Sequence, residues 1–156
     1  AGKIFSFEPI RENFDLLVSN LALNHIENVF PFNVGVSKKS DKLNLFLNND
    51  QSAYSIFPKG SESISVESTS LQKIFDEKKI SSCKLLKLDC EGAEYDIIDS
   101  LPIEYLDKIQ NMAIEYHLAD TKPELIKNLI LKIKNAGFKI KTVPHYDDMG
   151  FLIARK

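Results

Sequence analysis

The chain has 156 residues, a length that suits one folding domain with a substantial core. Its 44% apolar and 27% charged residues are typical of globular proteins, and a net charge of -2 with scattered Lys and Arg argues against a nucleic-acid partner. The sequence contains no apolar run near the ~18 residues that a membrane span needs.

The first half of the chain alternates strand-like and helix-like patterns. Residues 3–7 form a short β-type run, and apolar side chains at helical spacing follow over residues 9–24. Residues 28–36 are a second strand candidate. Apolar and polar side chains alternate over residues 42–68, which predicts antiparallel, half-exposed strands, and a short helix is expected over residues 71–79.

The middle of the chain repeats the alternation. Residues 85–90 are a nearly continuous apolar run, which predicts a strand covered on both faces. A helix is expected to begin near Gly92, and residues 111–117 predict the next strand.

The last part predicts one helix and two strands. Thr121 and Glu124 have the spacing of a capping box at the start of a helix, and Gly137 suits its C-terminal end. Residues 138–143 and 151–154 are the closing strands. Their connection is too short for a right-handed crossover, so they should pair antiparallel.

This order predicts an α/β fold of the Rossmann-like, doubly wound type. We expect a mostly parallel sheet that ends in an antiparallel hairpin, within one domain over residues 1–156. Such folds normally start with a strand, a Gly-rich turn and a helix, which cradle a cofactor. This pattern is not seen at Ala1–Lys3, so we expect the chain to start one β-α unit into its fold.

The two cysteines are poor disulfide partners. Cys83 and Cys90 would lie roughly 23 Å apart on one strand at ~3.3 Å per residue, whereas a disulfide needs Cα atoms within about 7 Å. Free thiols, with no signal peptide recognised at the start, indicate a reducing, cytoplasmic setting.

Acidic residues stand at or near the ends of three predicted strands. Glu8 follows the first strand, Asp89 ends the strand from Leu85, and Glu115 lies near the end of residues 111–117. Ligands of such sheets bind outside the carboxyl ends of the strands. We therefore expect these acids to share one edge and to mark a binding site.

Glu8 has two interpretations. Its carboxylate could accept hydrogen bonds from the hydroxyls of a ribose, as an acid at the end of the second strand does in dinucleotide folds. It could instead be a helix N-terminal acid, favoured by the dipole of the helix that starts at Pro9.

Four residues are candidates for catalysis: Lys87, Asp89, Glu91 and His117. Lys87 and Asp89 share one face of their strand, and a buried Lys must be paired or lose its proton. His117 could be a base or a ligand, or a satisfied core residue. Ser52 could offer a hydroxyl to a substrate or belong to a polar turn.

Several segments resemble one known family in order and spacing, over essentially the whole chain. Residues 5–9, 12–14, 33–37 and 114–117 resemble segments of the FkbM-type S-adenosylmethionine-dependent methyltransferases. The most specific segment, residues 86–94 with the sequence LKLDCEGAE, is similar to the signature of that family.

The resemblance implies a class I methyltransferase fold and S-adenosylmethionine as cofactor. The acceptor would be a hydroxyl group of a sugar or a natural product, and no metal is assigned. Asp89 or His117 could take the hydroxyl proton, and the sequence does not decide between them. By position, the cofactor-binding residues would be Glu8, Asn33, Val34, Gly35 and Asp89, and the acceptor would meet Ser52, Glu91, Glu115 and His117.

Because the Gly-rich loop is not seen, the chain by itself is expected to bind cofactor weakly and to be inactive. Two alternatives stay open. One is a divalent-metal-dependent α/β enzyme that uses Asp89, Glu91, Glu115 and His117 as ligands. The other is a non-catalytic binding module of the same fold. The sequence gives no oligomeric state.

Overall fold

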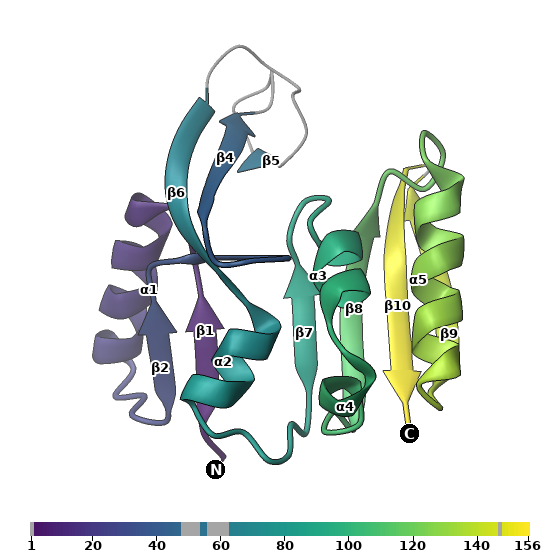
Figure 1. Cartoon of the computed structure of the whole chain (residues 1–156). Helices are drawn as coiled ribbons and strands as arrows, with labels where there is room; N and C mark the ends of the chain where they lie inside the picture. Colours follow the sequence, from purple (N-terminus) through teal and green to yellow (C-terminus); the bar gives the residue numbers. More distant parts are fainter. Residues whose placement is uncertain (1, 48–53, 56–62, 147) are drawn as a thin grey trace.

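The structure, a computed structural model, describes residues 2–47, 54–55, 63–146 and 148–156. Helices and strands alternate along most of the chain, so the predicted α/β class is confirmed (Figure 1). The elements are β1 (Ile4–Phe7), α1 (Arg11–Leu23), β2 (Val29–Phe32), β3 (Gly35–Ser37), β4 (Lys42–Leu47), β5 (Tyr54–Ser55), β6 (Ser63–Ser70), α2 (Leu71–Glu77), β7 (Leu86–Asp89), α3 (Glu94–Ser100), α4 (Ile103–Leu106), β8 (Asn111–His117), α5 (Pro123–Asn135), β9 (Lys139–Tyr146) and β10 (Met149–Arg155).

The described strands form three sheets rather than the expected mostly parallel one. Their orders are β1-β2, β3-β6-β4-β5 and β7-β8-β10-β9. The pairs β1–β2, β3–β6 and β7–β8 are parallel, whereas β4–β5, β4–β6, β8–β10 and β9–β10 are antiparallel. The sheets are therefore mixed. The antiparallel strands predicted over residues 42–68 are confirmed as β4 and β6.

The closing hairpin is antiparallel, as predicted, but its second strand lies inside the sheet and not at its edge. Strand β10 lies between β8 and β9, so Leu152 faces Ile114 on one side and Thr142 on the other. A strand that returns directly from β9 can only run antiparallel to it, and here it also runs antiparallel to β8. The parallel run of this sheet therefore ends at β8.

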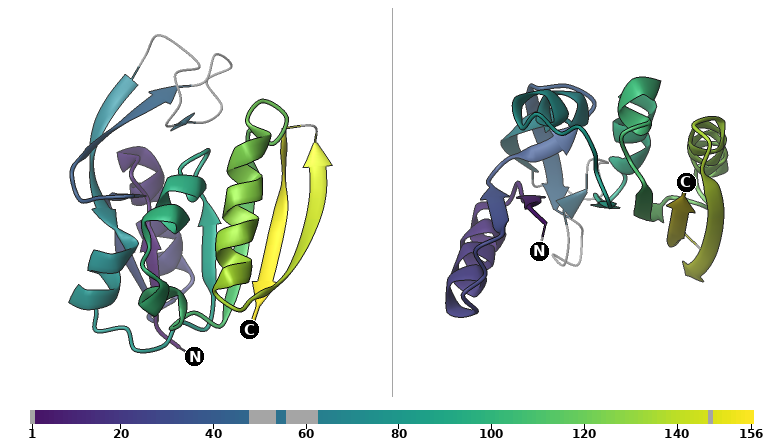
Figure 2. Two further views of the ribbon diagram at one scale, coloured as in Figure 1. Left: turned by 45° about the vertical axis from the view of Figure 1, so that its right-hand side comes forward. Right: turned by 90° about the horizontal axis from the view of Figure 1, so that it is seen from below.

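Helices α3 and α5 cover one face of the β7-β8-β10-β9 sheet (Figure 2). Side chains alternate along the strands, so Leu88, Ile114 and Leu152 point into the core under these helices. The opposite face is open: Lys87 and Asp89 have 67% and 41% of their side-chain surface exposed. The expectation that this strand is covered on both faces is wrong, because the helices of the described residues pack on one side of it only (Figure 2).

The strand expected over residues 28–36 is two strands in different sheets. Strand β2 ends at Phe32 beside β1, and β3 starts at Gly35 beside β6. Between them, the Asn33 side chain donates hydrogen bonds to the carbonyls of Glu8 (2.9 Å) and Pro9 (3.1 Å). These two hydrogen bonds connect the end of β2 to the end of β1, at the point where the chain leaves this sheet for β3.

One helix start agrees with its prediction and one differs. Helix α3, predicted to begin near Gly92, begins at Glu94, because Glu91 (φ 49°) and Gly92 (φ 105°) form a tight left-handed turn. Helix α5 has Lys122 as N-cap without a side-chain cap bond, so the capping box at Thr121 is wrong.

The Thr121 hydroxyl is instead placed 3.3 Å from Asp148 Oδ1. Gly137 (φ 84°) follows the C-cap Ala136, which confirms the predicted end of α5.

The direction of the parallel strands determines at which edge of the molecule the candidate site lies. The carboxyl ends of β1, β2, β7 and β8 point to the same edge of the molecule, the upper edge in Figure 1. In the described ranges, no helix has the length and apolar character to cross a membrane.

Candidate functional site

Three acidic or basic side chains meet where β7 and β8 end. Asp89 and Glu115 are register partners on the parallel pair β7–β8, so their Cα atoms lie side by side. Two residues earlier on β7, the Lys87 ammonium lies 3.0 Å from Asp89 Oδ2. This ion pair lies on the open face of the sheet.

His117, the last residue of β8, is the deepest member of this group. Only 11% of its side-chain surface is exposed. Its Nδ1 lies 3.2 Å from Glu94 Oε1, and its Nε2 lies 3.7 Å from both Glu91 Oε2 and Glu115 Oε1. The imidazole is thus the point at which residues from β8, the β7–α3 turn and α3 converge.

Two residues close to this imidazole have strained, left-handed backbone conformations. Glu91 has φ 49° in the turn after β7, and Leu118 has φ 61° immediately after His117. Left-handed conformations cost roughly 1–2 kcal/mol for residues with a Cβ. Such strain concentrates at functional sites when surrounding contacts hold it in place.

Those contacts come from Glu94, a buried carboxylate at the start of α3. Its Oε2 accepts a hydrogen bond from Gly92 N–H at 2.9 Å, and its Oε1 accepts one from His117 N–H at 2.9 Å. Glu94 therefore fastens both strained turns together. The Tyr95 hydroxyl adds a further hydrogen bond to the carbonyl of His117.

The electrostatic setting of His117 favours its charged form. Burial, the largest effect, lowers the pKa of the imidazole. The hydrogen bond and the charge of Glu94, with the charges of Glu91 and Glu115, outweigh burial and raise the pKa above the ordinary 6.5. The imidazole therefore keeps its proton to a higher pH than an ordinary histidine.

Cys90, inside the signature segment, is not a nucleophile at neutral pH. Burial raises the pKa of its thiol to about 12. Both Cys90 and Cys83 are free thiols. The expectation that they share one strand is wrong, because β7 runs only from Leu86 to Asp89 and Cys83 forms an isolated bridge with Ile109.

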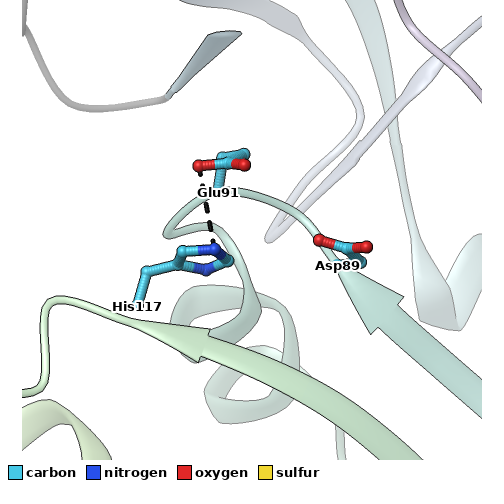
Figure 3. A group of neighbouring side chains, drawn as sticks. All are labelled: Asp89, Glu91 and His117. Carbon is cyan, nitrogen blue, oxygen red and sulfur yellow. Dashed lines mark ion pairs between the residues drawn. The ribbon is translucent and has the colours of Figure 1, made fainter. Parts of the chain in front are cut away.

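Part of the group is spaced to hold a metal ion (Figure 3). Ligand atoms of Asp89, Glu91 and His117 lie within 4.8 Å of one another. Two carboxylates and an imidazole suit Mn²⁺ or a similar divalent cation. Lys87 already supplies a positive charge beside Asp89, so an ion would compete with this ion pair.

Four of the five residues expected to bind the cofactor, all but Asp89, form a second group at or just after the ends of β1 and β2. Glu8 Oε1 accepts a hydrogen bond from Ile10 N–H at 2.8 Å, and Ile10 is the N-cap of α1. This is the contact of a helix N-terminal acid. Within the described part of the chain, Oε2 of Glu8 accepts no hydrogen bond. One carboxylate oxygen is therefore left to meet a ligand.

Asn33, Val34 and Gly35 connect this group to the neighbouring sheet. The Asn33 amide holds the chain ends described above, Val34 is half-buried and Gly35 is buried. A Cβ added at Gly35 would lie 3.6 Å from Glu67 O and from Pro9 Cβ, which is ordinary contact.

The structure thus brings five of the expected residues into one group, and places others apart from it. Glu8, Asn33 and Val34 lie at the ends of β1 and β2, in or beside a sheet separate from that of β7 and β8, and Gly35 starts β3 in the third sheet. Ser52 lies outside the described residues. The grouped residues are Lys87, Asp89, Glu91, Glu115 and His117.

Glu94 is the residue that the sequence interpretation missed as part of the site. An acid in the first turn of a helix is ordinarily explained by the helix dipole, and Glu94 stands at such a position. The sequence did contain a signal for its role. The neighbours of Glu94 are largely apolar (Ala93, Tyr95, Ile97 and Ile98), which predicts that its carboxylate is buried in the core.

A comparison with protein-family models matches the methyltransferase FkbM domain over residues 1–140. Searches among curated proteins and among solved structures found no match. The matched range includes both groups of residues, from Glu8 to His117, and covers most of the chain. The predicted resemblance is therefore confirmed, and the chain belongs to the FkbM methyltransferase domain family.

Proposed function

We propose that this chain serves an S-adenosylmethionine-dependent O-methyltransferase that acts on a hydroxyl of a sugar or a natural product. Membership of the FkbM family supports methyl transfer. The observation that carries the site assignment is the convergence of Asp89, Glu91, Glu115 and His117 at the carboxyl ends of β7 and β8. A methyl acceptor bound at this edge would contact carboxylates that can bind its hydroxyls and an imidazole that can remove a proton.

The cofactor, when bound, supplies a methyl group on a positively charged sulfur. An edge with several carboxylates suits a cation electrostatically. Glu8 fits the ribose because Oε2 of its carboxylate accepts no hydrogen bond in the described residues. Asn33, Val34 and Gly35 are proposed to lie by the adenine, and Asp89 to face the methyl group.

The acceptor is proposed to lie against the open side of the cluster. Glu91 and Glu115 would accept hydrogen bonds from hydroxyls of the acceptor, which fixes its orientation. Lys87 holds the Asp89 carboxylate in place through the 3.0 Å ion pair. Ser52 is proposed as a further contact.

Cofactor binding is tested with S-adenosylhomocysteine and the natural full-length protein, by calorimetry. Glu8→Gln keeps the Ile10 contact possible but removes the charge, and should weaken binding by about tenfold, as expected for a charged hydrogen bond of about 1.5 kcal/mol. The matched control is Glu12→Gln, since Glu12 is an exposed acid in the first turn of α1. Equal affinity of wild type and Glu8→Gln would contradict the ribose assignment.

Methyl transfer is tested by supplying radiolabelled S-adenosylmethionine with a panel of sugars and hydroxylated natural products. Asp89→Asn should lower turnover at least tenfold. Unchanged turnover would contradict the role of Asp89, whereas a wild-type protein that binds the cofactor but transfers no methyl group would support the non-catalytic binding module. Absence of both cofactor binding and transfer in the full-length protein would contradict the proposed function.

The spacing of Asp89, Glu91 and His117 favours a second candidate, an enzyme that depends on a divalent metal. The two candidates differ in a melting experiment with Mn²⁺ or with a chelator. A melting temperature that rises with Mn²⁺ in the wild type but not in Glu91→Gln supports the metal. A melting temperature that changes with neither addition contradicts it.

A further inference from the structure

Glu94 is the most deeply buried acidic side chain in the described residues, with 0% of its surface exposed. Buried carboxylates are costly unless several hydrogen bonds compensate for lost water. Here Gly92 N–H and His117 N–H both donate to it, and His117 Nδ1 lies 3.2 Å from Oε1. A carboxylate that receives two backbone donors in this way acts as an acceptor.

The third contact therefore decides the tautomer of His117. Glu94 Oε1 already accepts the hydrogen bond from His117 N–H, so the ring nitrogen that faces this acceptor oxygen carries the hydrogen. Nδ1–H donates to Glu94, and in the neutral imidazole the lone pair is then on Nε2. The hydrogen bonds of Glu94 thereby fix both the tautomer and the orientation of the ring.

Nε2 faces the residues that border the acceptor side of the cluster. Glu91 Oε2 and Glu115 Oε1 each lie 3.7 Å from it, too far for a hydrogen bond, and Figure 3 shows Glu91 placed over the ring. A hydroxyl that hydrogen-bonds to Glu91 or Glu115 would thus come within reach of Nε2.

Asp89 lacks this support. Its Oδ2 is engaged by the Lys87 ammonium at 3.0 Å, and its side chain is 41% exposed. His117, by contrast, is held by Glu94 Oε1, which contacts both its Nδ1 and its backbone N–H. The two candidate bases therefore differ in how firmly the fold holds them.

We propose that His117 Nε2 takes the proton of the acceptor hydroxyl, and that Glu94 is the positioning residue that makes this nitrogen the acceptor. This rests on the proposed O-methyl transfer. The acceptor oxygen forms its bond to the methyl carbon while the sulfur–carbon bond breaks, and the electron pair stays on sulfur, which becomes neutral. The hydroxyl proton moves to Nε2, and Glu94 stabilises the resulting imidazolium.

The tautomer is tested by NMR of protein labelled with ¹⁵N in its histidine rings, at a pH where His117 is neutral. The expected result for the wild type is a protonated Nδ1 and an unprotonated Nε2. Glu94→Gln should replace this signature by a mixture or by the other tautomer, while the signals of His25 and His145 stay in place. A wild-type His117 that carries its hydrogen on Nε2 overturns the proposal without any variant.

The chemical role is tested by rates of methyl transfer in the full-length protein. His117→Asn should lower kcat at least a hundredfold, as expected for loss of a general base, and Glu94→Gln at least tenfold with little change in affinity for S-adenosylhomocysteine. Glu104→Gln, in the first turn of α4, is the matched control and should leave the rate unchanged.

A wild-type rate in His117→Asn or in Glu94→Gln overturns the proposal. If the wild-type protein transfers no methyl group, the proposed function fails and the proton step with it. The NMR result still decides, separately, whether Glu94 sets the tautomer of His117.

Discussion

Gly150 provides the sharpest test of how the fold supports the site. It lies on β10 directly opposite Tyr116 of β8, the residue before His117. A Cβ added at Gly150 would meet the Tyr116 hydroxyl, and would lie 2.6 Å from Tyr116 Cζ and 2.8 Å from Val143 O. The 2.6 Å contact is about 0.9 Å shorter than the ~3.5 Å at which non-bonded carbon atoms settle.

The cost of Gly150→Ala follows from what has to move. The Tyr116 ring is buried, and the Val143 carbonyl belongs to the backbone of β9, so neither can rotate freely into solvent. Overpacking of this kind costs typically 1–3 kcal/mol. We expect a loss of about 2 kcal/mol in the free energy of unfolding. For a chain of this size, that corresponds to a melting temperature lower by about 4–8 °C.

Two further variants show whether this clash is the cause. Gly35→Ala is the control, since its added Cβ would make contacts of 3.5 Å and 3.6 Å, and stability should change by less than about 1 kcal/mol. Tyr116→Leu combined with Gly150→Ala should lose less than the sum of the single losses, because removing the ring relieves the clash. Urea unfolding measures the stability of the wild type, the three single variants and the double variant. A wild-type stability for Gly150→Ala would refute the reasoning.

Two other predictions use the titrating groups. Because the folded pKa of His117 is raised, its contribution to stability is full below the unfolded value of about 6.5 and is lost as pH rises through the folded pKa. Urea unfolding should therefore show a larger stability difference between wild type and His117→Gln at pH 5.5 than at pH 9. An equal difference at both pH values would contradict the pKa shift. Burial raises the pKa of Cys90 from 9.0 to about 12, so its thiolate should be about a thousandfold scarcer at pH 7.5 than for an ordinary thiol. Mass spectrometry should show iodoacetamide labelling Cys90 much more slowly in the native than in the unfolded protein, and equal rates would contradict the raised pKa.

Local sequence patterns predicted most helices and strands correctly, but they predicted less well how the strands assemble into sheets. The helices α1, α2 and α5 and the closing hairpin follow from apolar spacing and from Gly137, which are properties of neighbouring residues. Residues 28–36 were predicted as one strand. Their apolar run gives no sign that the Asn33 side chain hydrogen-bonds to the carbonyls of Glu8 and Pro9, where the strand is interrupted. Short α4 has too few residues for a period to appear.

The sequence by itself determined the α/β class, the family and which acidic residues stand at the ends of strands, because motifs and periodicity are read along the chain. Only the tertiary structure decided that β10 enters the sheet beside β8 and that one face of β7 is open. It also decided that Glu94 points at His117 across 23 positions of sequence. Such contacts depend on which elements pack together, and no local pattern encodes that choice.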